Sequence, residues 1–375
     1  MLISSLSSRL ARPSGIAVVI LLVLTLTVII PILRDSSWPT AKSPTLSAIC
    51  PAQGLVGIAG GSELGGLPDS QLDHELDAMR AMGATWLRVG FSWSRIERTR
   101  GDYDWTRSDR VMRHAVARGF KILGIILSTP VWARDARARY SQHALPADPT
   151  EFASFSGATA ERYGAHVTVW EIWNEPNIVA FAKPRPDVDR YHQMLVRSAA
   201  QIRAQMHDRQ VTIVTGGLSP AGDDGMNIAP ATFVKNLYDA GRQSAWDAIG
   251  LHPYTFPALP EDLSTAEWNP FQNLDKIRTI VDNHGDIGKQ IWFTEYGAPT
   301  QGPRSVTPLV QAKSIMQILN AAAKDIHLGP VFIHSSRDRG LDPDNIEHHF
   351  GLLNSNFEPK VAFFSVRLLA VCVGD

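Results

Sequence analysis

The chain has 375 residues, of which 44% are hydrophobic and 19% are charged. This composition is typical of a globular protein with a sizeable core, and it excludes a chain that is disordered along its whole length. The 36 basic and 37 acidic residues nearly cancel, so nothing in the net charge favours nucleic acid as a partner.

An apolar segment near the amino terminus predicts a link to a membrane. Residues 15–33 are almost all aliphatic or Thr, and Arg9 and Arg12 precede them. The length is close to the roughly 20 residues that cross a bilayer, and the two Arg residues place the tail of residues 1–14 inside the cell. We expect a single-pass anchor in the cell membrane, with the rest of the chain outside the cytoplasm. The alternative is a signal peptide whose removal gives a secreted protein.

Residues 34–51 are rich in Ser, Thr and Pro and predict a flexible tether. Cys50 stands at its end and Cys372 near the carboxyl terminus. An oxidising compartment would allow these two cysteines to form a disulfide, whereas two unpaired buried thiols are the equal alternative.

Residues 52–375 predict one α/β domain, a (β/α)₈ barrel of the TIM type. Short apolar, β-branched runs alternate here with longer amphipathic segments, which is typical of repeated βα units around a parallel sheet. Cap residues predict helices that begin near residues 69, 149 and 308, and a last helix is expected over residues 358–371. The expected strands are residues 55–58, 85–91, 121–127, 167–174, 211–216, 247–252, 290–295 and 330–334.

Carboxylates stand at the ends of two of these strands. The fourth strand ends in Asn174-Glu175 and the seventh in Glu295, and the carboxyl ends of barrel strands meet at one mouth. Retaining glycosidases need two carboxyl groups about 5–5.5 Å apart, one to protonate the leaving oxygen and one to attack the anomeric carbon. We therefore expect Glu175 to be the general acid/base and Glu295 the nucleophile, while Asn174 hydrogen-bonds the sugar hydroxyl next to the reacting carbon.

Several further blocks, in this order, resemble the clan of retaining barrel glycosidases, and within it glycoside hydrolase family 39 and its exopolysaccharide-hydrolase relatives. The resemblance covers most of residues 52–371. The blocks are Leu87-Arg88-Val89, Tyr103-Asp104-Trp105 and His252-Pro253-Tyr254, in addition to the two strand tips.

By this resemblance, Arg88 would support the nucleophile by its charge, and Tyr254 or His252 would hydrogen-bond near it. Trp132 and Trp93 are interpreted as aromatic residues that stack on sugar or line the mouth. Glu171, earlier on the fourth strand, is expected to be an ion-pair partner rather than a catalytic group.

The eighth strand departs from the family pattern. Relatives usually carry Trp or Tyr near its end, where the ring stacks on the sugar, but this chain has His334-Ser335-Ser336. We expect the altered surface to change which sugar fits at the reactive position.

The sequence thus predicts a glycosidase that acts on a polysaccharide of the cell surface or envelope, without a metal or other cofactor. Adjacent histidines, His348 and His349, point apart and make a weak metal site. The alternative function is a catalytically silent glycan-binding surface protein on the same barrel. Sugar identity, linkage, endo or exo action and oligomeric state depend on loops and surfaces that the sequence pattern does not define.

Overall fold

The structure is a computed structural model, and it describes residues 50–371 apart from residues 62, 208 and 242. The predicted tail, anchor and tether up to residue 49 lie outside the described residues, as does Cys372. Cys50 is disulfide-bonded. Within the described part of the chain, no helix is both long and apolar enough to cross a bilayer.

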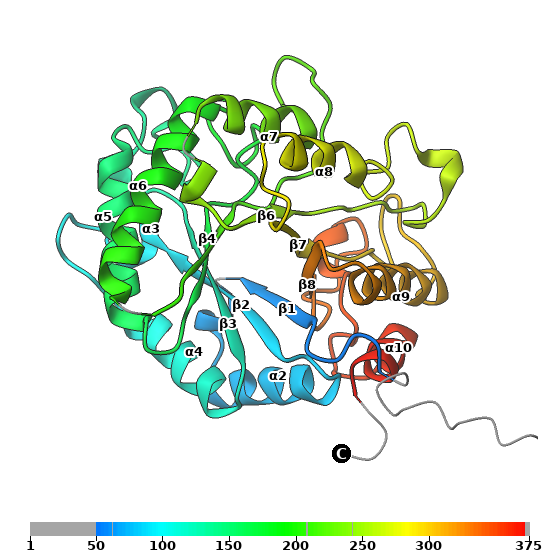
Figure 1. Ribbon diagram of the computed structural model, residues 1–375. Helices are drawn as coiled ribbons and strands as arrows, with labels where there is room; N and C mark the ends of the chain where they lie inside the picture. Colours follow the sequence, from blue (N-terminus) through cyan, green and yellow to red (C-terminus); the bar gives the residue numbers. More distant parts are fainter. Residues whose placement is uncertain (1–49, 62, 208, 242, 372–375) are drawn as a thin grey trace, which may run out of the picture. The chain divides into compact units, whose positions relative to one another are not determined.

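Eight parallel strands form a closed barrel in which each strand pairs with the next and β1 pairs with β8 (Figure 1). The barrel predicted from the sequence is confirmed, and the strand ends differ from the predicted ones by at most three residues. The strands are β1 Val56–Gly61, β2 Trp86–Ser92, β3 Lys121–Leu127, β4 Val169–Ile172, β5 Thr212–Thr215, β6 Ala248–Leu251, β7 Gln290–Tyr296 and β8 Leu328–Ile333.

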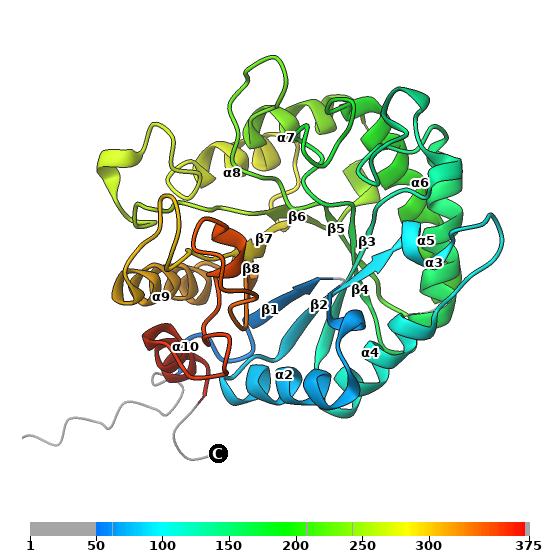
Figure 2. The same ribbon diagram turned by 180° about the vertical axis from the view of Figure 1, so that it is seen from behind.

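The helices surround the strands, as the two opposite views show (Figures 1 and 2). The α-helices are α2 Asp69–Ala81, α3 Trp93–Ile96, α4 Thr106–Ala117, α5 Pro149–Tyr163, α6 Val188–Met206, α7 Pro230–Asp239, α8 Leu274–Asn283, α9 Pro308–Lys324 and α10 Val361–Ala370. Short 3₁₀ helices are η3 Leu64–Gly66, η4 Val131–Ala133, η5 Ala136–Ala138, η6 Gln243–Ala245, η7 Leu263–Thr265 and η8 Ile346–His348.

The three predicted helix starts are confirmed, two of them with capping contacts and the one at Asp69 without a side-chain cap. The side chain of Asp148 accepts a hydrogen bond from the backbone N–H of Thr150 at the start of α5, and Thr307 does the same for Val310 in α9. The last helix, α10, is shorter than expected because Lys360 is still extended, with φ −82° and ψ 168°.

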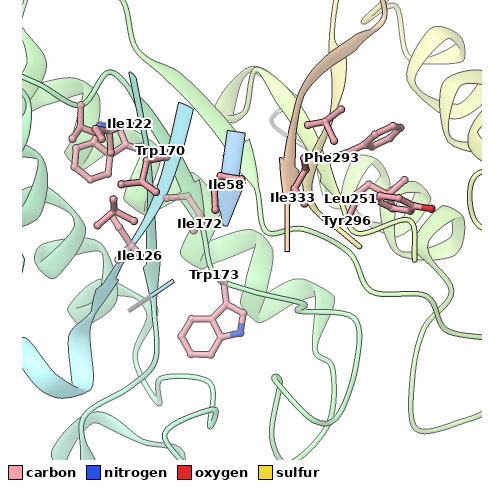
Figure 3. Close-up of a cluster of buried hydrophobic side chains, with 14 of the residues drawn as sticks. Ile58, Ile122, Ile126, Trp170, Ile172, Trp173, Leu251, Phe293, Tyr296 and Ile333 are labelled. Atoms are coloured by element: carbon pink, nitrogen blue, oxygen red, sulfur yellow. The ribbon is translucent and has the colours of Figure 1, made fainter. Parts of the chain in front are cut away.

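Two apolar layers stabilise the barrel. A small inner cluster takes one residue from each strand, and only the barrel axis brings all eight strands together. A larger outer cluster packs the other strand faces against the helices, with Trp170, Phe293 and Ile333 among its members (Figure 3). The inner cluster consists of Ala59, Leu123, Val169, Val214, Ala248, Trp292 and Phe332, with Trp86 packed against it.

Truncation of Phe332 tests the inner layer. Its ring is fully buried and fills the space beside Gly57, where an added Cβ would lie 2.5 Å from the ring. We expect Phe332→Ala to lower the free energy of unfolding by about 3–5 kcal/mol, because it removes apolar contacts and leaves a cavity. Denaturant unfolding checks this value. Phe364→Ala is the matched control, since that ring is 59% exposed on α10, and its effect should stay within about 0.5 kcal/mol. Equal losses in both variants would contradict the assignment of Phe332 to a packed interior.

Candidate active site

A cavity of about 1320 Å³ lies at the carboxyl ends of the strands, and all eight strands or the loops after them contribute to its lining. Active sites of such barrels form at this end. Five of the residues predicted from the sequence line the cavity, namely Arg88, Asn174, Glu175, Tyr254 and Glu295. The structure therefore brings the two predicted carboxylates, from β7 and from the turn after β4, into one cavity.

Arg88 on β2 holds three of the surrounding groups together. Its Nε and Nη2 donate to the two carboxylate oxygens of Glu171, at 2.6 and 3.1 Å, and its Nη1 donates to Oε1 of Glu295 at 2.6 Å. Nη2 also donates to Oδ1 of Asn174 at 2.8 Å. Glu171 is thus an ion-pair partner, as expected. The guanidinium fixes the position of Glu295 and of the amide of Asn174 at once, because its donors have a rigid planar geometry.

A bulge in β7 turns Glu295 toward the cavity. Opposite β8, Phe293 pairs with Val331 and Tyr296 with Ile333, so β7 has one extra residue in this interval. Strict alternation would place Glu295 on the same face as Phe293, in the outer layer. With the extra residue, Phe293 and Tyr296 both lie in the outer cluster, while Thr294 and Glu295 between them both face inward.

The surroundings of Glu295 keep its carboxylate ionised. Burial raises the pKa of Glu295, but His252, Arg88 and other nearby donors together lower it well below the usual carboxyl range. The hydroxyl of Tyr254 donates to Oε2 at 2.9 Å. Burial and the charge of Glu295 raise the pKa of Tyr254 well above its ordinary value, so this hydroxyl keeps its proton and remains a donor.

Glu175 shares a proton with His252. The Thr294 hydroxyl donates to Oε1 of Glu171, so it must accept from Nε2 of His252, 3.1 Å away. The other ring nitrogen, Nδ1, lies 2.9 Å from Oε1 of Glu175. Either the imidazole is charged and donates to a carboxylate, or Glu175 is protonated and donates to a neutral imidazole. In both forms the pair carries one transferable proton.

Backbone geometry also sets the position of Glu175. After β4 ends, Trp173 and Glu175 adopt positive φ values of 71° and 45°, which cost energy for non-glycine residues and cluster at functional sites. The N–H of Glu175 donates to the carbonyl of Gly217 at 3.1 Å. Gly217 has to be glycine because an added Cβ would lie 2.1 Å from Nε2 of His252.

The two carboxylates lie close to each other across the cavity. Nδ1 of His252 is 2.9 Å from Oε1 of Glu175 and 3.8 Å from Oε2 of Glu295. These two oxygens are therefore no farther apart than the sum of the two distances, 6.7 Å. This upper limit accommodates the spacing of about 5–5.5 Å typical of retaining glycosidases and lies at the lower edge of the roughly 6.5–9.5 Å of inverting ones.

The remaining predicted residues do not line the cavity. His252 is fully buried and acts through its contacts with Glu175 and Glu295. Trp93 is also fully buried, and its indole N–H donates to Oε2 of Glu97 at 2.6 Å, so it packs in the core instead of stacking on sugar. Trp132 packs edge-on against Trp93 beneath the guanidinium of Arg100. An aromatic residue near the end of a strand can pack in the core as readily as it can line the mouth of the barrel.

Three aromatic cavity residues were missed in the sequence because they come from loops, where no strand pattern marks them. Trp268, Phe256 and Phe350 supply aromatic side chains to the lining. His334, at the end of β8, also lines the cavity and lies 3.3 Å from Oε2 of Glu347 through its Nε2. A polar imidazole thus stands near Glu295 where relatives were expected to have a stacking ring.

Comparison with known structures finds the same barrel in glycoside hydrolases. A family 39 glycoside hydrolase from Bacteroides cellulosilyticus WH2 superposes with a TM-score of 0.67 at 21% identity, covering 85% of this chain and 64% of that one. A monomeric β-xylosidase from Caulobacter crescentus CB15 superposes with a TM-score of 0.63 at 17% identity, covering 84% of this chain and 67% of that one. A family 1 β-glucosidase from Thermotoga maritima superposes with a TM-score of 0.57 at 16% identity, covering 84% of this chain and 98% of that one. The resemblance to barrel glycosidases is confirmed.

The sequence comparisons are narrower. Residues 66–136 match the family model Glyco_hydro_42, described as beta-galactosidase. This segment includes Arg88 but neither candidate carboxylate. Comparison with curated proteins finds no matching sequence. The chain spans 64% of the length of the family 39 structure, and the structural likeness, at these identities, concerns the fold.

The His252–Glu175 pair should set the basic limb of the activity profile. Burial lowers the pKa of His252, but Glu295 and Glu175 raise it more, so its net pKa is above 6.5. The shared proton is then present at and below that pH and is lost as the pH rises through the raised pKa. We expect kcat/KM on an oligosaccharide, whose leaving group needs protonation, to fall only above pH 6.5. In His252→Gln the basic limb should move to lower pH, because the imidazole with the raised pKa that holds the shared proton is then missing. An unchanged basic limb would argue against the pair.

Proposed function

We propose that the protein is a retaining glycoside hydrolase, with Glu175 as general acid/base and Glu295 as nucleophile, that cleaves a polysaccharide of the cell surface or envelope. The observation that carries the proposal is the contact of both carboxylates with one nitrogen of His252, at 2.9 and 3.8 Å. Two carboxylates in one cavity at this spacing fit either side of a glycosidic bond.

The different surroundings of the carboxylates support their different roles. Glu295 receives hydrogen bonds from Arg88 and Tyr254, which favours the ionised form that a nucleophile needs. Glu175 shares a proton with His252, which an acid needs before the bond breaks. Opposed environments of two neighbouring carboxyl groups are the usual basis for separate acid and nucleophile roles.

The reaction then proceeds in two displacements. An oxygen of Glu295 attacks the anomeric carbon as the bond to the leaving oxygen breaks, and the proton shared by Glu175 and His252 passes to that oxygen. Water next attacks the same carbon, giving one proton to Glu175, and the bond to Glu295 breaks. Asn174, held by Arg88, would hydrogen-bond the neighbouring hydroxyl as positive charge develops on the sugar.

We also propose the location that the sequence suggests, with the barrel outside the cytoplasm and attached to the membrane through residues 15–33. Removal of that segment as a signal would give a secreted enzyme with the same site. Surface polysaccharide is accessible to the cavity in either case.

The nucleophile is tested with Glu295→Gln. This variant keeps the size of the side chain but removes the attacking charge, so we expect kcat on an aryl glycoside to fall by at least about a thousandfold. Product anomers followed by NMR should show retention in the parent. A fluoro-sugar that traps the glycosyl-enzyme should label Glu295, as peptide mass spectrometry would show. An active, unlabelled parent with inverted products would overturn the mechanism. A chain that binds glycan but neither turns over nor is labelled would be the silent glycan-binding protein.

The acid is tested separately with Glu175→Ala. A natural glycan has a poor leaving group and needs protonation, so its turnover should fall by about 10²–10⁴-fold. An aryl glycoside with a dinitrophenyl leaving group needs little protonation, and its glycosylation step should fall much less. Pre-steady-state rates on both substrates separate the two effects. Equal losses on the two substrates would remove Glu175 from the role of acid.

A further inference from the structure

Trp268 presents an exposed aromatic ring to the cavity, away from the core. It lies between β6 and α8, in the long segment of residues 252–273 (Figure 1). Its side chain is 49% exposed and lines the cavity. Of the nine tryptophans that the structure describes, Trp268 is the one that is exposed. Among the described residues, no aromatic ring packs on its indole and no acceptor bonds the indole N–H. Packing of the fold therefore does not explain this residue.

The loop that carries Trp268 is fixed by its own polar side chains. Asn269, the next residue, is fully buried, and its amide donates to the carbonyls of Leu259 and Pro260, each at 3.2 Å. Its Oδ1 accepts from the N–H of Phe271 at 3.0 Å. Gln272 donates to the carbonyl of Pro260 at 2.6 Å. A loop pinned in this way fixes the backbone of Trp268 before any ligand arrives, which reduces the entropy lost on binding.

Polar groups accompany the ring on the same wall of the cavity. Glu267, Asn273 and Lys276 line it together with Trp268, and the ammonium group of Lys276 makes no ion pair within the described part of the chain. An apolar ring face with hydrogen-bonding groups beside it matches a pyranose, which has a face of C–H bonds and a rim of hydroxyls.

The cavity is large enough for more than one sugar. Its volume of about 1320 Å³ exceeds the roughly 300–1,000 Å³ of ordinary small-molecule pockets. The residues around the two carboxylates come from the strand ends, whereas Trp268 belongs to a loop outside that group. A glycan of several sugars could therefore contact both the carboxylates and Trp268, which line one cavity.

We propose that Trp268 is the platform of a second sugar subsite and that the substrate is an oligosaccharide or polysaccharide that fills both subsites, not a single sugar on a small leaving group. This inference rests on the proposed glycosidase function and specifies its substrate class. Trp268 acts by stacking on a ring of the same glycan chain that Glu175 and Glu295 cut.

Affinity electrophoresis of the full chain tests the subsite without requiring turnover. Glu295→Gln protein in detergent is run through native gels that contain mixed-linkage β-glucan, arabinoxylan or galactomannan. We expect at least one polymer to retard it. Adding Trp268→Ala should weaken the affinity by about tenfold, the equivalent of a lost aromatic contact, whereas Trp268→Tyr should retain most of it. Leu263→Ala is the matched control, because Leu263 lies in the same loop, is 77% exposed and does not line the cavity.

Hydrolysis supplies a second measurement, made in the protein that retains Glu295. Trp268→Ala should raise KM more for an oligosaccharide than for an aryl monoglycoside, while Leu263→Ala changes neither. Equal retardation of the Trp268→Ala and control proteins, or no retardation of the starting protein in any gel, would overturn the subsite. If the aryl glycoside is still cleaved in that case, the glycosidase function stands without it. Retardation that depends on Trp268 in a protein that cleaves no glycoside would leave the subsite standing and reject the glycosidase function.

Discussion

The buried ion pairs of Arg88 are the interaction on which the site depends. Arg88 and Glu171 are buried and the Glu295 side chain is only 19% exposed at the cavity wall. Taking charges out of water is costly unless each is paired and hydrogen-bonded. Glu171 meets this demand, since its oxygens also accept from the backbone of Gly217 and the hydroxyl of Thr294. The guanidinium then has one remaining side for Glu295. Arg88, Glu171 and Glu295 stand on three different strands. The carboxylate of Glu295 is therefore placed only when the barrel is closed.

The same network makes the two carboxylates unequal. Glu295 faces a permanent cation and a phenol, so removing its charge would leave buried donors without a partner. Glu175 faces an imidazole, which can donate a proton to it or accept one from it. Thr294 connects the two halves, because its hydroxyl bonds Glu171 on one side and His252 on the other. The orientation of the Thr294 hydroxyl thus links the charged pair of Glu171 and Arg88 to the imidazole of His252, which shares its proton with Glu175.

The sequence predicts the parts of this molecule that depend on local patterns. Eight apolar runs with polar tips are enough to place the strands, and the residues around Glu175 and Glu295 identify the two carboxylates. Patterns do not distinguish a ring in the core from a ring on a wall, which is why Trp93 was assigned to sugar and Trp268 was overlooked. The link through His252 also escaped detection, since it joins β6 to the turn after β4 and exists only once the barrel has closed.

The extra residue in β7 has a consequence for how such a protein can change. It makes Thr294 and Glu295 neighbours on one inner surface, so loss of a single codon in this strand would turn one of them into the outer layer and separate the two halves of the network. Beyond Tyr296 the chain is still buried at residues 297–299, and exposed positions in the loop before α9 begin at residue 301. Insertions and exchanges of loop segments should therefore accumulate after the bulge and not before it, and this is the place to graft new specificity.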